Sequence, residues 1–164
     1  MAAAVALASE FVQCKPRRKT VLVVEDEAFV REAICELLEQ GDYNVLRAEN
    51  AYRARKLFRN CYQEIDVVLC DAVLPDGNGV FLIKALRQLS SGLKVVLTSG
   101  YPLSEAPHQV VNAQEMRLLA KPYSGSALIA MLESALRDSS PKTRATSVCG
   151  AIADGFQDHA RNLV

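Results

Sequence analysis

The sequence predicts an α/β fold in which five parallel strands form one sheet, doubly wound by five helices. Short apolar runs rich in β-branched residues recur without polar alternation, which is typical of strands buried on both faces. Longer segments with apolar residues at helical spacing separate these runs. Parallel strands need such crossover helices, and right-handed crossovers place them on both faces of the sheet.

The first half of the alternation begins with an uninterrupted apolar run at residues 20–24. Residues 27–40 follow as an amphipathic helix, which Gly41 is expected to end. Residues 43–48 predict a weaker second strand. Asn50 is a suitable N-cap for the second helix, because its side chain can accept a hydrogen bond from the first turn.

The second half repeats the pattern. Strands are predicted at residues 65–70, 93–98 and 116–120, and helices at 80–89, 104–112 and 124–137. Asp76-Gly77 indicates a turn before the third helix, whose N-cap is expected near Asn78. Ser104 can cap the short fourth helix, which is the weakest element of the prediction.

Composition limits the classes of protein that fit. Lys and Arg together number 19, as do Asp and Glu, so no global charge favours nucleic acid or an anionic membrane. Five cysteines at irregular spacing disfavour a disulfide framework or a zinc site and suit a reducing cytoplasm. The apolar run at residues 1–8 is too short to span a bilayer.

The chain is expected to hold one domain. Residues 1–19 predict a flexible leader, residues 20–137 the domain, and residues 138–164 a linker followed by an amphipathic pattern. The basic run at residues 15–19 leaves a phosphate-binding patch as an alternative. The last segment is a partner-docking helix, a helix folded back on the domain, or a frayed end, and it is too short for a helix-turn-helix domain.

Polar side chains follow four of the predicted strands. They are Glu25 and Asp26, then Asp71, Thr98 and Lys121. Ligands of such sheets bind at the carboxyl ends of the strands, so these side chains are expected to share one crevice. Clustered carboxylates repel one another unless a cation joins them, and an all-oxygen site suits Mg²⁺. A metal, an ammonium and a hydroxyl around one carboxylate fit phosphoryl transfer to that carboxylate.

These blocks together resemble the response-regulator receiver family of two-component signalling. The resemblance rests on Val-Val-Glu25-Asp26-Glu, Asp71-Ala-Val-Leu-Pro-Asp-Gly, Thr98-Ser-Gly-Tyr and Lys121-Pro122, and it covers roughly residues 20 to 137. It implies a flavodoxin-like receiver fold. It also implies a cytoplasmic phosphorelay protein that a histidine kinase or a histidine phosphotransfer protein phosphorylates.

The resemblance also implies a role for each site residue. Asp71 is the expected phospho-acceptor, and Thr98 and Lys121 are expected to bind the phosphoryl group. Glu25, Asp26, Asp71 and the backbone carbonyl of Val73 are the expected Mg²⁺ ligands. The chain would then be a switch rather than an enzyme, apart from self-catalysed phosphorylation and dephosphorylation. Its output would be a protein partner, with no direct contact to nucleic acid or membrane.

One position departs from the family pattern. Leu118 stands three residues before the lysine, where the family often has an aromatic side chain that rotates on activation. Either the switch works without that rotation, or Tyr101 substitutes for the aromatic side chain. The surface expected to change shape comprises residues 103–119 and 124–137.

Two other functions stay open from the sequence. A small-substrate phosphotransferase would need a second acidic residue, acting as general base, two residues after Asp71, where Val73 stands. A receiver fold that works as a scaffold without phosphorylation would not need the full set of five polar residues. Taken singly, each of these residues also fits an ordinary loop, strand or surface position.

Overall fold

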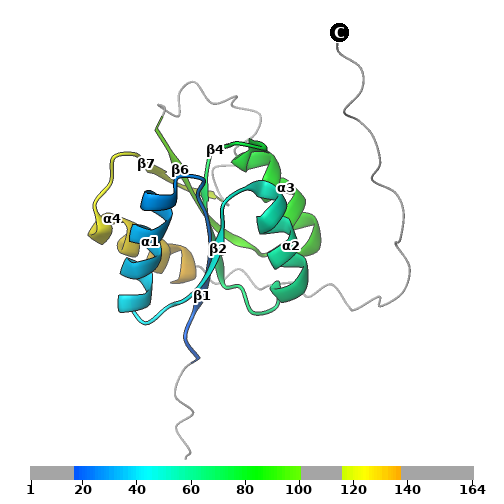
Figure 1. Cartoon of the computed structure of the whole chain (residues 1–164). Coiled ribbons are helices and arrows are strands. Elements are labelled where there is room, and N and C mark those ends of the chain that lie inside the picture. The colour runs from blue at the N-terminus through cyan, green and yellow to red at the C-terminus, as the bar shows by residue number, and fades with distance from the viewer. Residues whose placement is uncertain (1–16, 101–115, 138–164) are drawn as a thin grey trace, which may run out of the picture.

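A computed structural model of the chain describes residues 17–100 and 116–137 (Figure 1). Its main sheet has five parallel strands in the order β2-β1-β3-β6-β7. Their bounds are Thr20–Val24 (β1), Asn44–Ala48 (β2), Val67–Asp71 (β3), Lys94–Ser99 (β6) and Met116–Ala120 (β7). The predicted parallel five-stranded sheet is confirmed.

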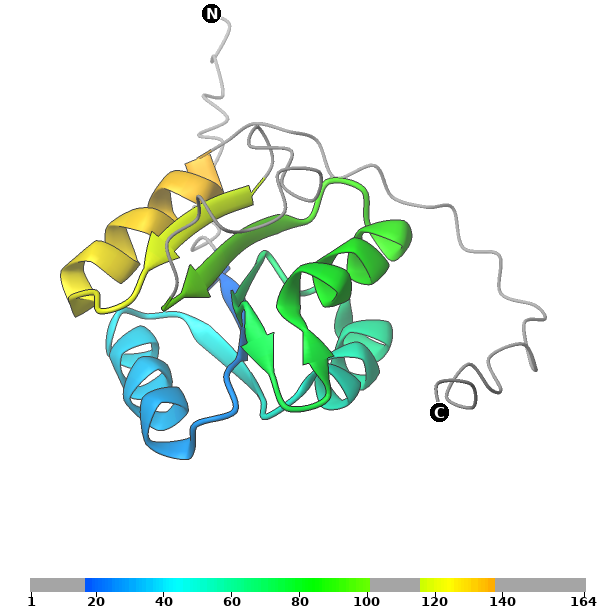
Figure 2. The same cartoon turned by 90° about the horizontal axis from the view of Figure 1, so that it is seen from above.

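Four helices lie in the described ranges. They are Ala28–Gln40 (α1), Ala51–Cys61 (α2), Gly79–Leu89 (α3) and Gly125–Arg137 (α4). Helices α1 and α4 cover one face of the sheet, and α2 and α3 cover the other (Figures 1 and 2). The predicted helix at residues 104–112 lies outside the described residues, as do Tyr101 and the segments 1–16 and 138–164.

Alternate residues of each central strand enter different cores, which explains why the strands are apolar throughout. In β1, Leu22 and Val24 face the core beneath α2 and α3, whereas Val21 and Val23 face the core beneath α1 and α4. Phe58 of α2 fills the first core and is fully buried. Full burial of a side chain of this size contributes about 1.5–3 kcal/mol to folding.

Side-chain caps begin two of the helices as expected. The Asn50 side chain accepts a hydrogen bond from the Arg53 N–H, and the Asn78 side chain accepts one from the Val80 N–H, both over 2.8 Å. Between β3 and α3, the predicted turn contains a small antiparallel hairpin of Val73–Leu74 (β4) and Gly77–Asn78 (β5). The hairpin shapes the segment that directly follows Asp71.

Residues 17–19, which the sequence assigned to the leader, pair with acids of the folded domain. Arg17 and Lys19 contact the Asp66 carboxylate at 3.1 and 3.4 Å, and Arg18 contacts Asp42 at 2.6 Å. Asp66 also accepts a hydrogen bond from the Thr20 N–H over 2.9 Å. These carboxylates pair with the three described cations of the run that the alternative interpretation assigned to phosphate.

Candidate functional site

The register of the sheet brings the ends of separate strands to one level. Val24 of β1 lies opposite Cys70 of β3, so Glu25 and Asp71 follow neighbouring strands at the same height. Asp71 in turn lies opposite Thr98 of β6. The Lys121 N–H donates to the carbonyl of Ser99 over 2.8 Å. This bond places Lys121, the first residue after β7, beside the end of β6. The pairing of the strands therefore brings together the residues that the sequence predicts to share one site.

Three carboxylates meet there. One carboxylate oxygen from each of Glu25, Asp26 and Asp71 lies within 4.8 Å of the others. Glu25 is buried at 3 % exposure, Asp71 is partly buried and Asp26 is exposed. The cluster is therefore buried on the side of Glu25 and open to solvent on the side of Asp26.

Lys121 bridges two of these acids. Its ammonium lies 2.9 Å from a carboxylate oxygen of Glu25 and also donates a short hydrogen bond to Asp71. Burial lowers the pKa of Lys121, but the hydrogen bonds to Asp71 and Glu25 outweigh it and raise the pKa above its usual value. The ammonium thus stays charged throughout the physiological range.

The pKa of Glu25 is also raised above its usual value, and burial is the main cause. The charge of Asp71 adds to this effect, while the hydrogen bond from Lys121 acts to lower the pKa. Three carboxylates and one ammonium leave a formal charge of 1 − 3 = −2. A divalent cation would balance that charge.

The donor set fits Mg²⁺. Opposed ligands of an octahedral Mg²⁺ lie about 4.2 Å apart, so oxygens already within 4.8 Å need only small movements to share one ion. The fourth expected ligand, the carbonyl of Val73, belongs to a residue whose N–H donates to the Asp71 carboxylate over 3.0 Å. Val73 is 59 % exposed, which leaves this side of the site accessible.

Thr98 lies at the floor of the site. Its side chain is almost completely buried, and its hydroxyl makes a long hydrogen bond of 3.5 Å to the carbonyl of Cys70. A bond of this length is weak, so the hydroxyl can turn toward a stronger acceptor at little cost. All five polar residues that the sequence singled out are therefore brought together, although their roles remain predictions.

Three residues near the site were missed from the sequence. Arg31 donates to the backbone carbonyls of Glu25 and Asp26 at 2.9 and 3.2 Å and so holds the acidic pair in place. Tyr123 has a buried hydroxyl, and burial raises its pKa, while an interaction with the Thr98 hydroxyl acts to lower it. An arginine one helical turn after paired acids is a signal that could have found Arg31, whereas no sequence signal marks the Tyr123 hydroxyl.

The third missed residue is Asp76, which had been interpreted as part of a turn. Its carboxylate accepts hydrogen bonds from the Ala51 and Tyr52 N–H groups, each over 2.8 Å. It therefore caps α2 from a distant part of the chain, beside the local cap Asn50. Contacts between segments 24 or 25 residues apart leave no local signal in the sequence.

Leu118 stands where the family often has an aromatic residue, and the structure shows its surroundings. Leu118 lies in β7, is half-buried, and packs against the core beneath α2 and α3. The Lys121–Pro122 peptide bond that follows is cis.

Comparison with known proteins agrees with this geometry. The family model for the response regulator receiver domain matches residues 21–133. The chain is 30% identical over 125 residues to the phosphate regulon transcriptional regulatory protein PhoB of Pseudomonas aeruginosa, covering 75% of this chain and 54% of PhoB. It is also 30% identical over 105 residues to the sensor kinase CckA of Brucella abortus, covering 64% of this chain and 11% of CckA. The chain thus spans about half the length of PhoB and a small part of CckA.

Solved structures show the same fold. A response regulator receiver domain from Clostridium thermocellum superposes with a TM-score of 0.67 at 22% identity, covering 72% of this chain and 94% of that chain. The receiver domain of the hybrid histidine kinase CckA superposes with a TM-score of 0.62 at 26% identity, covering 72% and 99%. The family match spans most of the sequence, and the chain belongs to the response-regulator receiver family of two-component signalling.

Proposed function

We propose that this receiver accepts a phosphoryl group on Asp71 and acts as a phosphorylation-controlled protein-binding switch. The observation that carries the proposal is the meeting of Glu25, Asp26 and Asp71 around one position, with Lys121 bonded to two of them. A histidine kinase or a histidine phosphotransfer protein is the donor that the family suggests. Beyond self-catalysed phosphorylation and dephosphorylation, the chain is not proposed to be an enzyme.

The chemistry follows from the orientation of Asp71. The Val73 N–H binds one carboxylate oxygen and Lys121 binds the other, so the carboxylate is held in one position. An Asp71 oxygen attacks phosphorus and forms the new P–O bond. The P–N bond of the donor phosphohistidine breaks, its electron pair returns to the imidazole nitrogen, and that nitrogen takes up a proton.

Other residues of the site stabilise the transferred group. Lys121 can exchange its carboxylate partners for a phosphoryl oxygen, and the Thr98 hydroxyl can donate to another. Glu25, Asp26, Asp71 and the Val73 carbonyl would hold Mg²⁺. When bound, the ion supplies positive charge that lets an anionic phosphoryl group approach a carboxylate.

A cytoplasmic location accompanies this proposal. Cys35, Cys61 and Cys70 are free thiols, as expected in a reducing compartment. Burial raises the pKa of Cys35 to about 11, which keeps that thiol protonated and unreactive. No helix in residues 17–100 or 116–137 is long and apolar enough to cross a bilayer.

The test is phosphorylation by a small donor. Incubation with Mg²⁺ and acetyl phosphate should add one phosphoryl group by intact mass, and neither Asp71→Asn nor a sample with excess chelator should gain it. Absence of labelling in the wild-type chain would favour the scaffold, and many turnovers of a small phosphorylated substrate would favour the phosphotransferase. Either result would overturn the proposal.

A further inference from the structure

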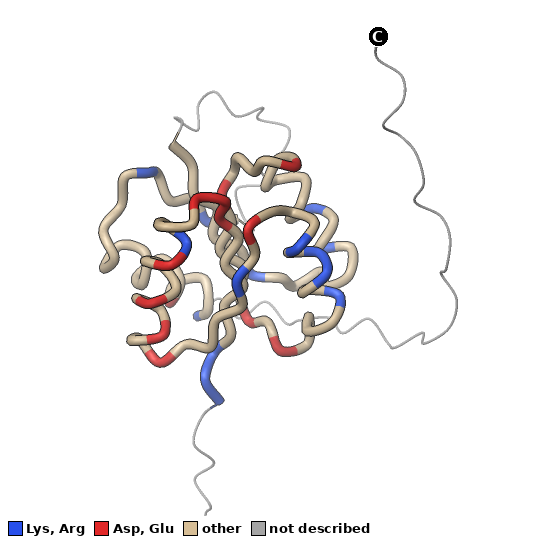
Figure 3. Tube along the Cα trace, viewed as in Figure 1, with Lys and Arg blue, Asp and Glu red and all other residues tan. Residues whose placement is uncertain are grey.

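The two helical layers of the domain carry opposite charge. Helices α2 and α3 contain six basic residues and no acidic ones: Arg53, Arg55, Lys56, Arg59, Lys84 and Arg87. Helices α1 and α4 contain four acidic and two basic residues: Glu32, Glu36, Glu39, Glu133, Arg31 and Arg137. Figure 3 shows the basic residues gathered over α2 and the acidic ones over α1. The formal net charge of zero conceals this separation.

The charges of the two layers also differ in how they are paired. On the acidic side, Arg47 forms ion pairs with Glu32 and Glu39 at 3.5 and 2.8 Å. On the basic side, Arg53, Lys56 and Arg59 are exposed, and none of them forms an ion pair with a residue in the described ranges. The positive field of this side is therefore available to a partner.

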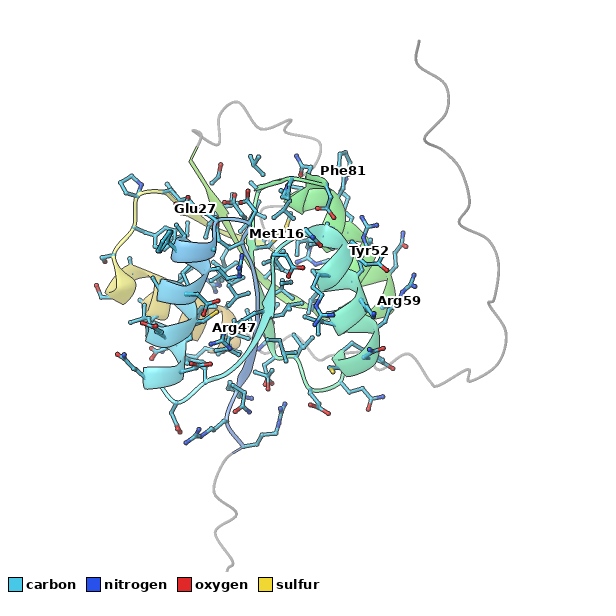
Figure 4. All side chains as sticks on the ribbon, in the orientation of Figure 1. Glu27, Arg47, Tyr52, Arg59, Phe81 and Met116 are labelled. Atoms are coloured by element: carbon cyan, nitrogen blue, oxygen red, sulfur yellow. The ribbon has the colours of Figure 1, made fainter. Side chains whose placement is uncertain are left out.

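Two aromatic side chains stand among these cations. Tyr52 of α2 is 71 % exposed and Phe81 of α3 is 63 % exposed. Figure 4 shows both, with Arg59, on the outer side of the α2 and α3 layer. The Lys84 ammonium lies 5.8 Å from the centre of the Phe81 ring. Exposed aromatic and arginine side chains in one patch are typical of the centres of protein interfaces.

The helical spacing places three exposed residues of α2 in one stripe. Tyr52, Lys56 and Arg59 follow positions i, i+4 and i+7, so they share a face of the helix. We propose that this stripe, together with Phe81 and Lys84, forms a docking surface for an acidic segment of another protein. We call these five residues the α2–α3 surface.

A protein segment fits this surface better than a nucleic acid duplex. The cations require negative charge, and the two exposed rings require apolar atoms to cover them. An acidic amphipathic segment offers both carboxylates and apolar side chains. A duplex meets a protein mainly through its phosphates, which would leave Tyr52 and Phe81 without apolar contacts.

The α2–α3 surface is bonded to the segment that carries Asp71. Asp76 lies five residues beyond Asp71 and accepts hydrogen bonds from the backbone of Ala51 and Tyr52 at the start of α2. A change at Asp71 can therefore reach Tyr52 through one short loop. This coupling rests on the proposed phosphorylation, whereas docking itself does not.

The probe for the test is a labelled helical peptide with Glu along one face and Leu along the other. Binding is followed by fluorescence anisotropy, with a short DNA duplex of equal charge as the comparator oligonucleotide. The peptide should bind the full chain tighter than the oligonucleotide. The double variant Lys56→Glu with Arg59→Glu should lose about tenfold or more in affinity. Arg137→Glu, at an exposed position of α4 outside this surface, changes the charge in the same direction and is the control, which should bind as the wild type does.

Three results would overturn the proposal: no binding of the peptide, tighter binding of the oligonucleotide, or equal binding by the double variant. Thermal unfolding of each variant confirms that the chain is folded before binding is compared. Asp71→Asn should keep peptide binding, so a failure of phosphorylation and a failure of docking are distinguishable. Acetyl phosphate with Mg²⁺ should shift the affinity of the wild type and leave that of Asp71→Asn unchanged.

Discussion

The Lys121 ammonium lies 2.9 Å from the Glu25 carboxylate, although the two residues are 96 positions apart in the chain. Glu25 is nearly fully buried, so its charge depends on a partner inside the protein. Lys121 provides this partner and at the same time holds Asp71. One cation therefore links the stability of the site to the orientation of the proposed phospho-acceptor.

Replacement of Lys121 with Met tests this link. The variant leaves the buried Glu25 charge without its ammonium, next to a second carboxylate. Because the Lys121 side chain is itself partly exposed, we expect a loss of about 2 kcal/mol in the free energy of unfolding, measured with urea at neutral pH. Adding Glu25→Gln to the same chain should restore most of the loss. Equal stability of wild type and Lys121→Met would contradict the interpretation.

Binding of Mg²⁺ should stabilise the folded chain, because the acidic cluster exists only when the strands are paired. The midpoint of thermal unfolding should rise with Mg²⁺ concentration and return on chelation. Asp26→Asn removes one ligand and should abolish most of the rise. Glu27→Gln changes a neighbour that is also exposed but lies outside the cluster, so it should keep the wild-type response. A loss of response in both variants would point to a general charge effect.

Gly79, the first residue of α3, lies against the backbone of Asp71. A Cβ atom on Gly79 would lie 2.0 Å from the carbonyl oxygen of Asp71, so Gly79→Ala must displace that backbone. We expect a loss of about 1–3 kcal/mol in stability and slower labelling by acetyl phosphate. Gly100→Ala is the control, since nothing in the described residues lies within 4 Å of its added Cβ. Similar effects at both positions would argue against a specific steric requirement at Gly79.

The sequence sufficed for the sheet and for the five polar residues of the site, because both follow from local patterns. Buried parallel strands are apolar at every position, and the polar residue that ends each run is visible in the sequence. Once these strands pair in parallel, their register places Asp71 opposite Thr98.

Features that depend on contacts between distant segments were not visible. The third strand begins at Val67 rather than at residue 65, and Asp66 just before it binds Arg17, Lys19 and the Thr20 N–H through its side chain. The separation of charge also escaped prediction. It depends on which helices share a face, and the total over the chain is zero.

Asp76 should contribute to stability as a cap of α2. Loss of its two hydrogen bonds in Asp76→Ala should cost about 1 kcal/mol, measured by urea unfolding. Glu36→Ala, an exposed acid on α1, should cost much less. An unchanged free energy of unfolding for Asp76→Ala would show that Asn50 alone caps the helix.

The contribution of Asp76 should also depend on pH. Burial acts to raise the pKa of Asp76, but the N–H donors of Ala51 and Tyr52 outweigh it and lower the pKa below its usual value. A lowered pKa in the folded state means that the stabilisation is present above the unfolded pKa, near 3.9, and is lost as the pH falls through the folded value. The stability difference between wild type and Asp76→Ala should therefore shrink below about pH 4. A difference that stayed constant down to pH 2 would rule out the charged form as its source.

Substitution of two phenylalanines on adjacent helices should have different effects on folding and on docking. Phe58 is fully buried beneath α2, and Phe58→Ala should lower the free energy of unfolding by about 3–5 kcal/mol through the cavity it creates. Phe81 is 63 % exposed, so little packing is lost in Phe81→Ala and its free energy of unfolding should stay within about 0.5 kcal/mol of the wild type. Phe81→Ala should nevertheless weaken binding of the acidic peptide, because Phe81 belongs to the α2–α3 surface. A large loss of stability in Phe81→Ala would instead assign that ring to the core, and its exposure would no longer argue for a partner.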